Sequence, residues 1–155
     1  MSDIRTILSA DHVQAGLGCA NKKALFQQLG LFGSRATGID AKSIVTALSE
    51  RERLGSTGFG NGVAIPHGKL AGLDHVFGYF VRLSNPMDFQ SIDGLPVDLV
   101  FMLLSPPEAG ADHLKALASV SRLLRDQSML AKLRGARTTD AIYALLAGVE
   151  ALDAA

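Results

Sequence analysis

A cluster of glycines between Gly55 and Gly62 divides this chain into parts with different hydrophobic periodicity. Ahead of the cluster, apolar residues recur at helical spacing, whereas after it they form short continuous runs that are typical of strands. Beyond Pro106-Pro107 the helical spacing returns. Because helices flank a central block of strands, the sequence predicts an α/β fold, a single domain with a mixed β-sheet flanked by helices on both faces.

Cap and turn residues give the expected limits of these elements. Asn21 can cap a first helix that ends in the region of Gly30 to Gly33, and Asp40 can cap a second helix over residues 41–53. The expected strands cover residues 63–65, 76–83 and 97–104, with turns at Asn85-Pro86 and Asp93-Gly94. Helices are expected again over residues 112–124, 128–133 and 139–146, the first with an apolar stripe of Leu114, Leu117, Val120 and Leu124.

Composition excludes several classes of protein. The chain has 155 residues with 15 Lys+Arg and 15 Asp+Glu, so its formal net charge is zero. Binding to a nucleic-acid backbone is therefore not expected, because that affinity comes from a surplus of cations on one face. The longest strongly apolar run, Leu99 to Leu104, is far shorter than the roughly 20 residues of a membrane span. With Cys19 as the only cysteine and no signal-peptide pattern, we expect no membrane insertion and a cytoplasmic location.

The glycine cluster does not fit either common nucleotide-binding motif. Asn61 stands where a Walker A loop needs lysine, and the third glycine of a dinucleotide fingerprint is missing. Two interpretations remain. Backbone N–H groups of the glycines can converge on an anion, with Ser56 and Thr57 adding hydroxyl donors, or the segment is a tight loop that leads into a strand.

His67 is the first candidate for chemistry. Pro66 favours an extended Ile65, so the short strand is expected to end there and to present His67 at its end. Gly68 leaves room for a bound phosphoryl group, which makes Ser56, Thr57 and Gly68 candidates for a phosphoryl-binding loop. A neutral imidazole can act as a nucleophile when its other nitrogen is held as a donor. The alternative is an ordinary loop histidine.

Two further residues are candidates for holding an anion. His113 falls at the expected start of a helix, where the backbone N–H groups favour negative charge, although it can equally be a helix-start residue without a role. Arg51 can clamp phosphoryl oxygens in a bidentate manner, or it can oppose the helix dipole together with Arg53.

The remaining histidines, His12 and His75, have neighbours that indicate surface or structural roles. None of the common metal-ligand spacings of histidine or cysteine occurs, so no metal and no cofactor is expected.

The segment from Glu52 to Gly68, with Val63-Ala64-Ile65-Pro66-His67-Gly68 at its end, resembles the phosphorylation-site signature of a bacterial family. That family is the enzyme IIA (EIIA) proteins of the phosphoenolpyruvate-dependent phosphotransferase system (PTS), fructose/mannitol class. Residues 51–58, 87–101 and 113–117 resemble the same family, and the likeness extends from about Ile4 to Leu146. Residues 1–155 are therefore expected to form a single EIIA type-2 domain with its motif-bearing core at about 4–147.

The resemblance also implies roles for single residues. His67 would accept a phosphoryl group from a phosphohistidine on a small HPr-like carrier protein (NPr). His113 would be the second active-site histidine, and Arg51 its cationic neighbour. Phe59 stands where a smaller aliphatic residue is commoner in the family, a variation that leaves the nucleophile in place.

Within the family the chain most resembles the nitrogen-regulatory branch, because it reads as a free-standing domain with the short opening Ile4 to Leu8. The expected function is then a regulatory phosphocarrier, of the transferase class, whose phosphorylation state changes its binding to proteins such as transporters or sensor kinases. One alternative is a sugar-specific EIIA that passes its phosphoryl group to a IIB domain. Another is a binding module that holds an anion and is never modified at His67.

Overall fold

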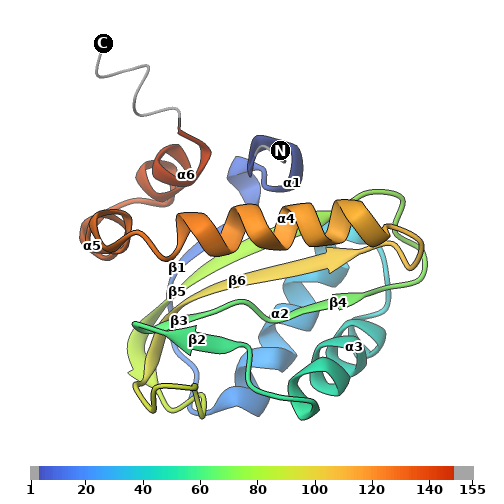
Figure 1. The fold of residues 1–155 in the computed structure, drawn as a ribbon, viewed down its shortest axis with the longest axis horizontal. Helices are drawn as coiled ribbons and strands as arrows, with labels where there is room; N and C mark the ends of the chain where they lie inside the picture. Colours follow the sequence, from blue (N-terminus) through green and yellow to red (C-terminus); the bar gives the residue numbers. More distant parts are fainter. Residues whose placement is uncertain (1–3, 149–155) are drawn as a thin grey trace.

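The computed structural model describes residues 4–148 and contains one mixed sheet (Figure 1). The strands along the sheet follow the order β1-β5-β6-β3-β2, and β4 pairs with β6. Neighbouring strands are parallel in the pairs β1–β5, β3–β6 and β4–β6, and antiparallel in β5–β6 and β2–β3. The strands are β1 (Val13–Leu17), β2 (Gly58–Gly60), β3 (Val63–Ala64), β4 (His67–Lys69), β5 (Phe77–Met87) and β6 (Val97–Ser105).

Helices cover both faces of this sheet, which confirms the predicted α/β class. The helices are α1 (Ile4–Ile7), η1 (Ala10–His12), α2 (Lys22–Thr37), α3 (Ala41–Arg53), α4 (Gly110–Leu123), α5 (Gln127–Gly135) and α6 (Thr139–Ala147). One hydrophobic cluster joins α2 and α3 to the sheet, and a second joins it to α1, α4, α5 and α6. Along β6, Phe101 points into one cluster and Met102 into the other, which explains the uninterrupted apolar run of this central strand.

The predicted limits of α3 and the predicted cap of α2 at Asn21 are confirmed, but the predicted end of α2 is wrong. Asp40 caps α3 by accepting a hydrogen bond from Ser43 N–H at 3.2 Å. Helix α2 does not end near Gly30, and it continues to a left-handed cap at Gly38 (φ 78°). The glycines inside α2 let α3 approach closely, since a Cβ on Gly30 would lie 2.6 Å from Val45 Cγ2.

The strand predictions need correction. β5 does not turn at Asn85-Pro86, and it continues to Met87 with an irregular register against β6. β1 and β2 were not expected. β2 is a short segment made mostly of glycine, and β1 pairs with β5, which lies far along the chain. The turn at Asp93-Gly94 is confirmed by a hydrogen bond from Gly94 N–H to the Ser91 carbonyl (3.0 Å).

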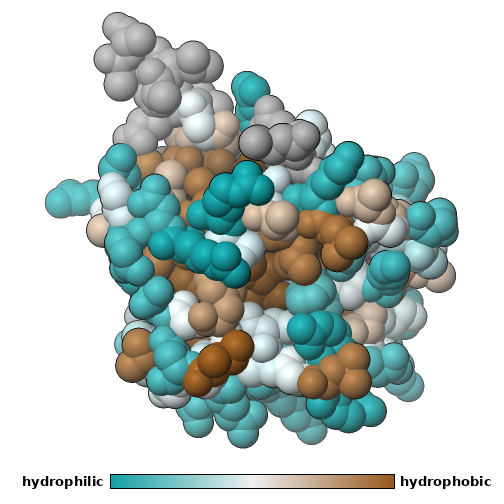
Figure 2. Space-filling view, viewed as in Figure 1, coloured by the Kyte–Doolittle hydropathy of each residue, from teal (hydrophilic) through white to brown (hydrophobic). Residues whose placement is uncertain are grey.

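The apolar stripe expected over residues 112–124 is confirmed at Val120 and Leu124, which are buried, but it is wrong at Leu114. Leu114 is 65 % exposed, while His113, Ala116 and Val120 are buried against the sheet. Figure 2 shows apolar side chains at the surface over α4. In the first turn of α4, His113 therefore faces the sheet, where the pattern had placed Leu114. None of the helices in residues 4–148 combines the length and the apolar character that a bilayer crossing requires.

Candidate functional site

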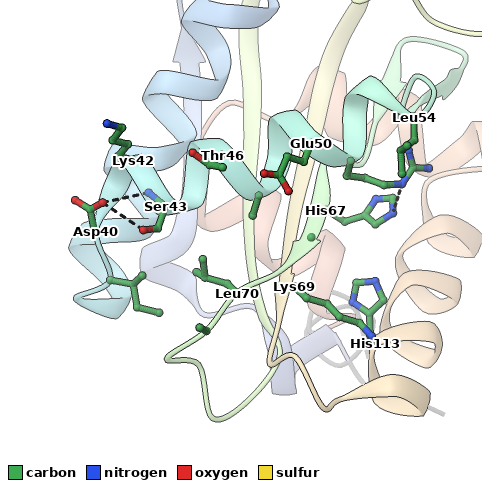
Figure 3. Close-up of a pocket in the computed structure, with 15 residues that line it drawn as sticks. Asp40, Lys42, Ser43, Thr46, Glu50, Leu54, His67, Lys69, Leu70 and His113 are labelled. Atoms are coloured by element: carbon green, nitrogen blue, oxygen red, sulfur yellow. Dashed lines mark hydrogen bonds between the residues drawn. The ribbon is translucent and has the colours of Figure 1, made fainter.

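A groove of about 820 Å³ runs along α3 and brings together the three residues for which the sequence suggested chemistry (Figure 3). Arg51 comes from the last turn of α3, His67 from the start of β4 and His113 from the first turn of α4. Gly68 and Lys69 also line the groove. Residues that are distant in the sequence therefore meet at one edge of the sheet.

His67 begins a strand, and this differs from its expected place after a strand end. Pro66 has no N–H group, so it separates β3 from β4, and both strands pair with the same side of β6. The Pro66 carbonyl still accepts a hydrogen bond from Leu103 N–H at 2.9 Å. The chain thus resumes its pairing at once, and His67 is held by a strand on a central element of the sheet.

Hydrogen bonds define which nitrogen of His67 carries the proton. Nδ1 lies 2.7 Å from the Ile65 carbonyl oxygen. Because a carbonyl can only accept, Nδ1 is the protonated nitrogen. Nε2 keeps its lone pair, which accepts a hydrogen bond from Arg51 Nε–H at 3.2 Å. Burial, with a further contribution from Arg51, lowers the pKa of His67, although the Ile65 bond and Glu52 act in the other direction. The ring is therefore a neutral imidazole at pH 7.

His113 lies beside this ring, with 5.8 Å between the two ring centroids. Its side chain is buried, and Nδ1 lies 2.6 Å from the hydroxyl of Ser105. Burial lowers the pKa of His113, and Coulombic interaction with His67 and Lys69 acts in the same direction. Sequence reasoning missed Ser105. Its signal was a polar residue that directly follows the apolar run of β6 and precedes two prolines.

Charged residues of both signs line the groove around the two histidines. Arg51 is oriented by a second hydrogen bond, from its Nη1 to the Gly55 carbonyl at 2.9 Å. Lys69 and Glu50 lie further along the groove, and Glu50 was not expected there. Arg53 instead lines a separate cavity beside Lys22. Residues 4–148 hold no group of three or more His, Cys, Asp or Glu side chains that could share a metal ion.

The glycine cluster forms a hairpin between β2 and β3. Asn61 and the glycines on either side of it have positive φ, which produces the tight turn. The interpretation as a tight loop into a strand is thus the one that the structure supports. Gly68 serves close packing as well, because a Cβ there would lie 3.2 Å from the Ala47 carbonyl oxygen of α3.

Ser56 and Thr57 do not reach the groove as their expected role requires. Thr57 donates hydrogen bonds from its N–H group and from its hydroxyl to the carboxylate of Glu52. The Ser56 hydroxyl accepts a hydrogen bond from Gly58 N–H at 3.1 Å. The groove lining contains neither residue, whereas it does contain Gly68.

Both site histidines are expected to titrate below their usual value of 6.5, because burial disfavours their charged forms. The folded protein then binds these protons less tightly than the unfolded chain. Their contribution to stability is complete above about pH 6.5 and decreases as the pH falls below that value. An NMR titration of the ring carbon-bound protons measures both midpoints. A midpoint above 6.5 for His67 would contradict the neutral imidazole.

Comparison with known proteins identifies the class that this fold and site define. The model of a family described as "Phosphoenolpyruvate-dependent sugar phosphotransferase system, EIIA 2" matches residues 6–149. The chain belongs to this family.

Its similarity within the family is to nitrogen regulatory proteins. A nitrogen regulatory protein from Bradyrhizobium diazoefficiens is 49 % identical over 93 % of this chain and 94 % of its own length. One from Pseudomonas aeruginosa is 39 % identical over 86 % of each chain. The crystal structure of the nitrogen regulatory protein IIA-Ntr from Neisseria meningitidis superposes with a TM-score of 0.88 at 36 % identity, and covers 92 % of this chain and 98 % of that one.

Proposed function

We propose that this protein is a cytoplasmic regulatory phosphocarrier of the nitrogen-related PTS, in which residues of about 4–147 form the EIIA core. It accepts a phosphoryl group at His67 from a phosphohistidine of an HPr-like carrier protein (NPr). The observation that carries this proposal is the protonation pattern of His67. The Ile65 carbonyl holds the proton on Nδ1, and Nε2 faces Arg51 with its lone pair.

The transfer step needs no base and no metal. The Nε2 lone pair attacks the phosphorus of the donor phosphohistidine as the N–P bond of the donor breaks, and the donor nitrogen recovers that electron pair. Nδ1 of His67 keeps its proton throughout, shared with the Ile65 carbonyl. Such a transfer depends on positioning and on charge stabilisation of the three phosphoryl oxygens.

Arg51 and His113 provide that stabilisation. The Arg51 guanidinium leaves Nε2 when phosphorus arrives and moves onto the phosphoryl oxygens as a charge-assisted donor. If the Ser105 hydroxyl donates to Nδ1 of His113, the proton of that ring is on Nε2 and is available to a phosphoryl oxygen. Leu54, which is 85 % exposed on the groove lining, offers an apolar contact for the protein donor.

Regulation follows from the change in charge. Phosphorylation adds about −1.5 to −2 charges at pH 7 if it resembles that of other side chains, and the chain has no net charge to mask the change. A partner such as a transporter or a sensor kinase can therefore distinguish the two states at the groove. The match to nitrogen regulatory proteins over nearly the full length of both chains supports this role.

The test begins with a phosphorylated HPr-like carrier that transfers labelled phosphate to this protein. An acid-labile, alkali-stable label is expected, as for a phosphoramidate. Affinity capture with the phosphorylated and unphosphorylated forms should then recover different partners. The family also serves sugar transport. Loss of uptake of one sugar in cells without this protein, with normal nitrogen and potassium responses, would favour a sugar-specific EIIA that passes its phosphate to a IIB domain.

Replacing His113 with glutamine should slow phosphoryl transfer about 100-fold, which is the order of effect for one lost donor to a developing charge. Glutamine keeps polar atoms near the buried Ser105 hydroxyl, so the fold should persist. Rapid-quench transfer kinetics measure the rate, and circular dichroism melting checks the fold. Wild-type kinetics in a folded variant would remove His113 from the site.

A further inference from the structure

A partly buried ion pair lies behind the groove, on the other side of the C-terminal end of α3. The Glu52 side chain is 7 % exposed and contacts Lys22 Nζ at 2.8 Å. The same carboxylate accepts the N–H and hydroxyl of Thr57. None of these three residues lines the groove that contains the histidines.

Helix stability does not explain this arrangement. Glu52 is the penultimate residue of α3, where the helix dipole disfavours a carboxylate, and Lys22 is the first residue of α2, where it disfavours a cation. Partial burial of the two charges adds a desolvation cost. Lys22 and Glu52 thus lie at helix ends that disfavour their charges, and there they contact each other, while Glu52 also contacts Thr57.

Hydrogen bonds connect this ion pair to the nucleophile. The Thr57 carbonyl accepts from Ile65 N–H at 3.0 Å, which extends the β2–β3 hairpin by one pair. The Ile65 carbonyl in turn accepts from Nδ1 of His67 at 2.7 Å. The Thr57 contact fixes the Ile65 N–H group on one side of the Ile65 carbonyl, and the bond from Leu103 N–H to the Pro66 carbonyl holds the chain on the other side. The path therefore runs from Lys22 through Glu52, Thr57 and Ile65 to the ring of His67.

We propose that Lys22, Glu52 and Thr57 form a positioning relay that sets the tautomer and the direction of the His67 ring. The relay rests on the proposed function for its effect on phosphoryl transfer, but not for its effect on the ring. The Glu52 carboxylate anchors Thr57 by accepting hydrogen bonds from its N–H and hydroxyl groups, and Thr57 in turn aligns the Ile65 carbonyl with Nδ1 of His67. The proton is thereby kept off Nε2, which is the atom that must attack.

Thr57→Val and Thr57→Ser form a matched pair for the test, because valine removes the hydroxyl donor at nearly constant shape and serine retains it. Ring ¹⁵N chemical shifts of His67 report the tautomer. We expect Thr57→Val and Glu52→Gln to raise the fraction of the Nε2–H form several-fold, and Thr57→Ser to leave it unchanged. Asp140→Asn, an exposed carboxylate in the first turn of α6, controls for the loss of one charge.

Kinetics with the phosphorylated carrier provide the second measurement. The maximal transfer rate should fall about tenfold in Thr57→Val, the order expected for one hydrogen bond to a charged group. The half-saturating donor concentration should stay constant, because the relay does not touch the groove.

Several outcomes would overturn the relay. An unchanged tautomer in Thr57→Val, equal changes in the valine and serine variants, or an unchanged maximal rate would each do so. If the unsubstituted protein accepts no phosphate, the proposed function fails. The ring ¹⁵N chemical shifts of His67 still show whether the relay sets the tautomer. If Glu52→Gln does not fold, the Thr57 pair decides it.

Discussion

Replacement of His67 with alanine is expected to abolish phosphoryl acceptance completely. The variant lacks Nε2, the nitrogen whose lone pair faces the groove. His113 is not expected to replace it, because its Nδ1 contacts the Ser105 hydroxyl, and donation from that hydroxyl leaves the ring proton on Nε2. Incubation with a labelled phosphorylated carrier, followed by electrophoresis under alkaline conditions, measures the transferred phosphate.

His75→Ala is the matched control for this experiment. His75 is an exposed histidine whose Nδ1 contacts the adjacent Asp74, and the groove lining does not include it. Label should therefore persist in this variant at the wild-type level. Acid-labile phosphate on the folded His67→Ala protein would refute the assignment of the acceptor.

Gly30→Val is expected to lower the free energy of unfolding by about 2 kcal/mol, a typical cost of overpacking. A Cβ at this position would lie 2.6 Å from Val45 Cγ2 and 3.0 Å from the Ala41 carbonyl oxygen. The Ala41 carbonyl oxygen belongs to the backbone and cannot rotate away as a side chain could, so α2 and α3 must move apart. Valine improves helix propensity over glycine by only a few tenths of a kcal/mol. Urea denaturation followed by circular dichroism measures the change.

Gly135→Val provides the comparison for this steric argument. Gly135 also lies in a helix, and no atom comes within 4 Å of a Cβ built there. Its substitution should change the stability by less than about 0.5 kcal/mol, as is usual for surface positions. Equal destabilisation of the two variants would show that contact between α2 and α3 is not the cause.

Elements with local signals were predictable from the sequence. Helix α3 has a capping Asp40 and a regular apolar spacing, and its predicted bounds match those in the structure. Strand β1 carries no such signal, because its pairing with β5 joins Val13 to Phe80, far along the chain. Gly30 was misread as a helix end for the same reason. Its role depends on α3, which lies outside any local window.

In the candidate site, the reactive side chains were predictable from the sequence, but the groups that position them were not. His67, His113 and Arg51 were proposed from the sequence, and the structure brings them together. The Ile65 carbonyl that selects the tautomer could not be found in this way, because every residue has a backbone carbonyl. Glu52 was missed because a charged residue on an amphipathic helix usually indicates a solvated face.

The hydrogen bond between Arg51 and His67 has a consequence for metal ions. Neutral imidazole is the commonest metal ligand in proteins, and an accessible Nε2 lone pair attracts Zn²⁺ or Cu²⁺. Here a permanently charged guanidinium occupies that lone pair, so an approaching cation meets both a competitor and a repelling charge. The same Arg51 guanidinium attracts an anionic phosphoryl group. The Arg51 guanidinium thus disfavours a metal cation at Nε2 and favours an anionic group there.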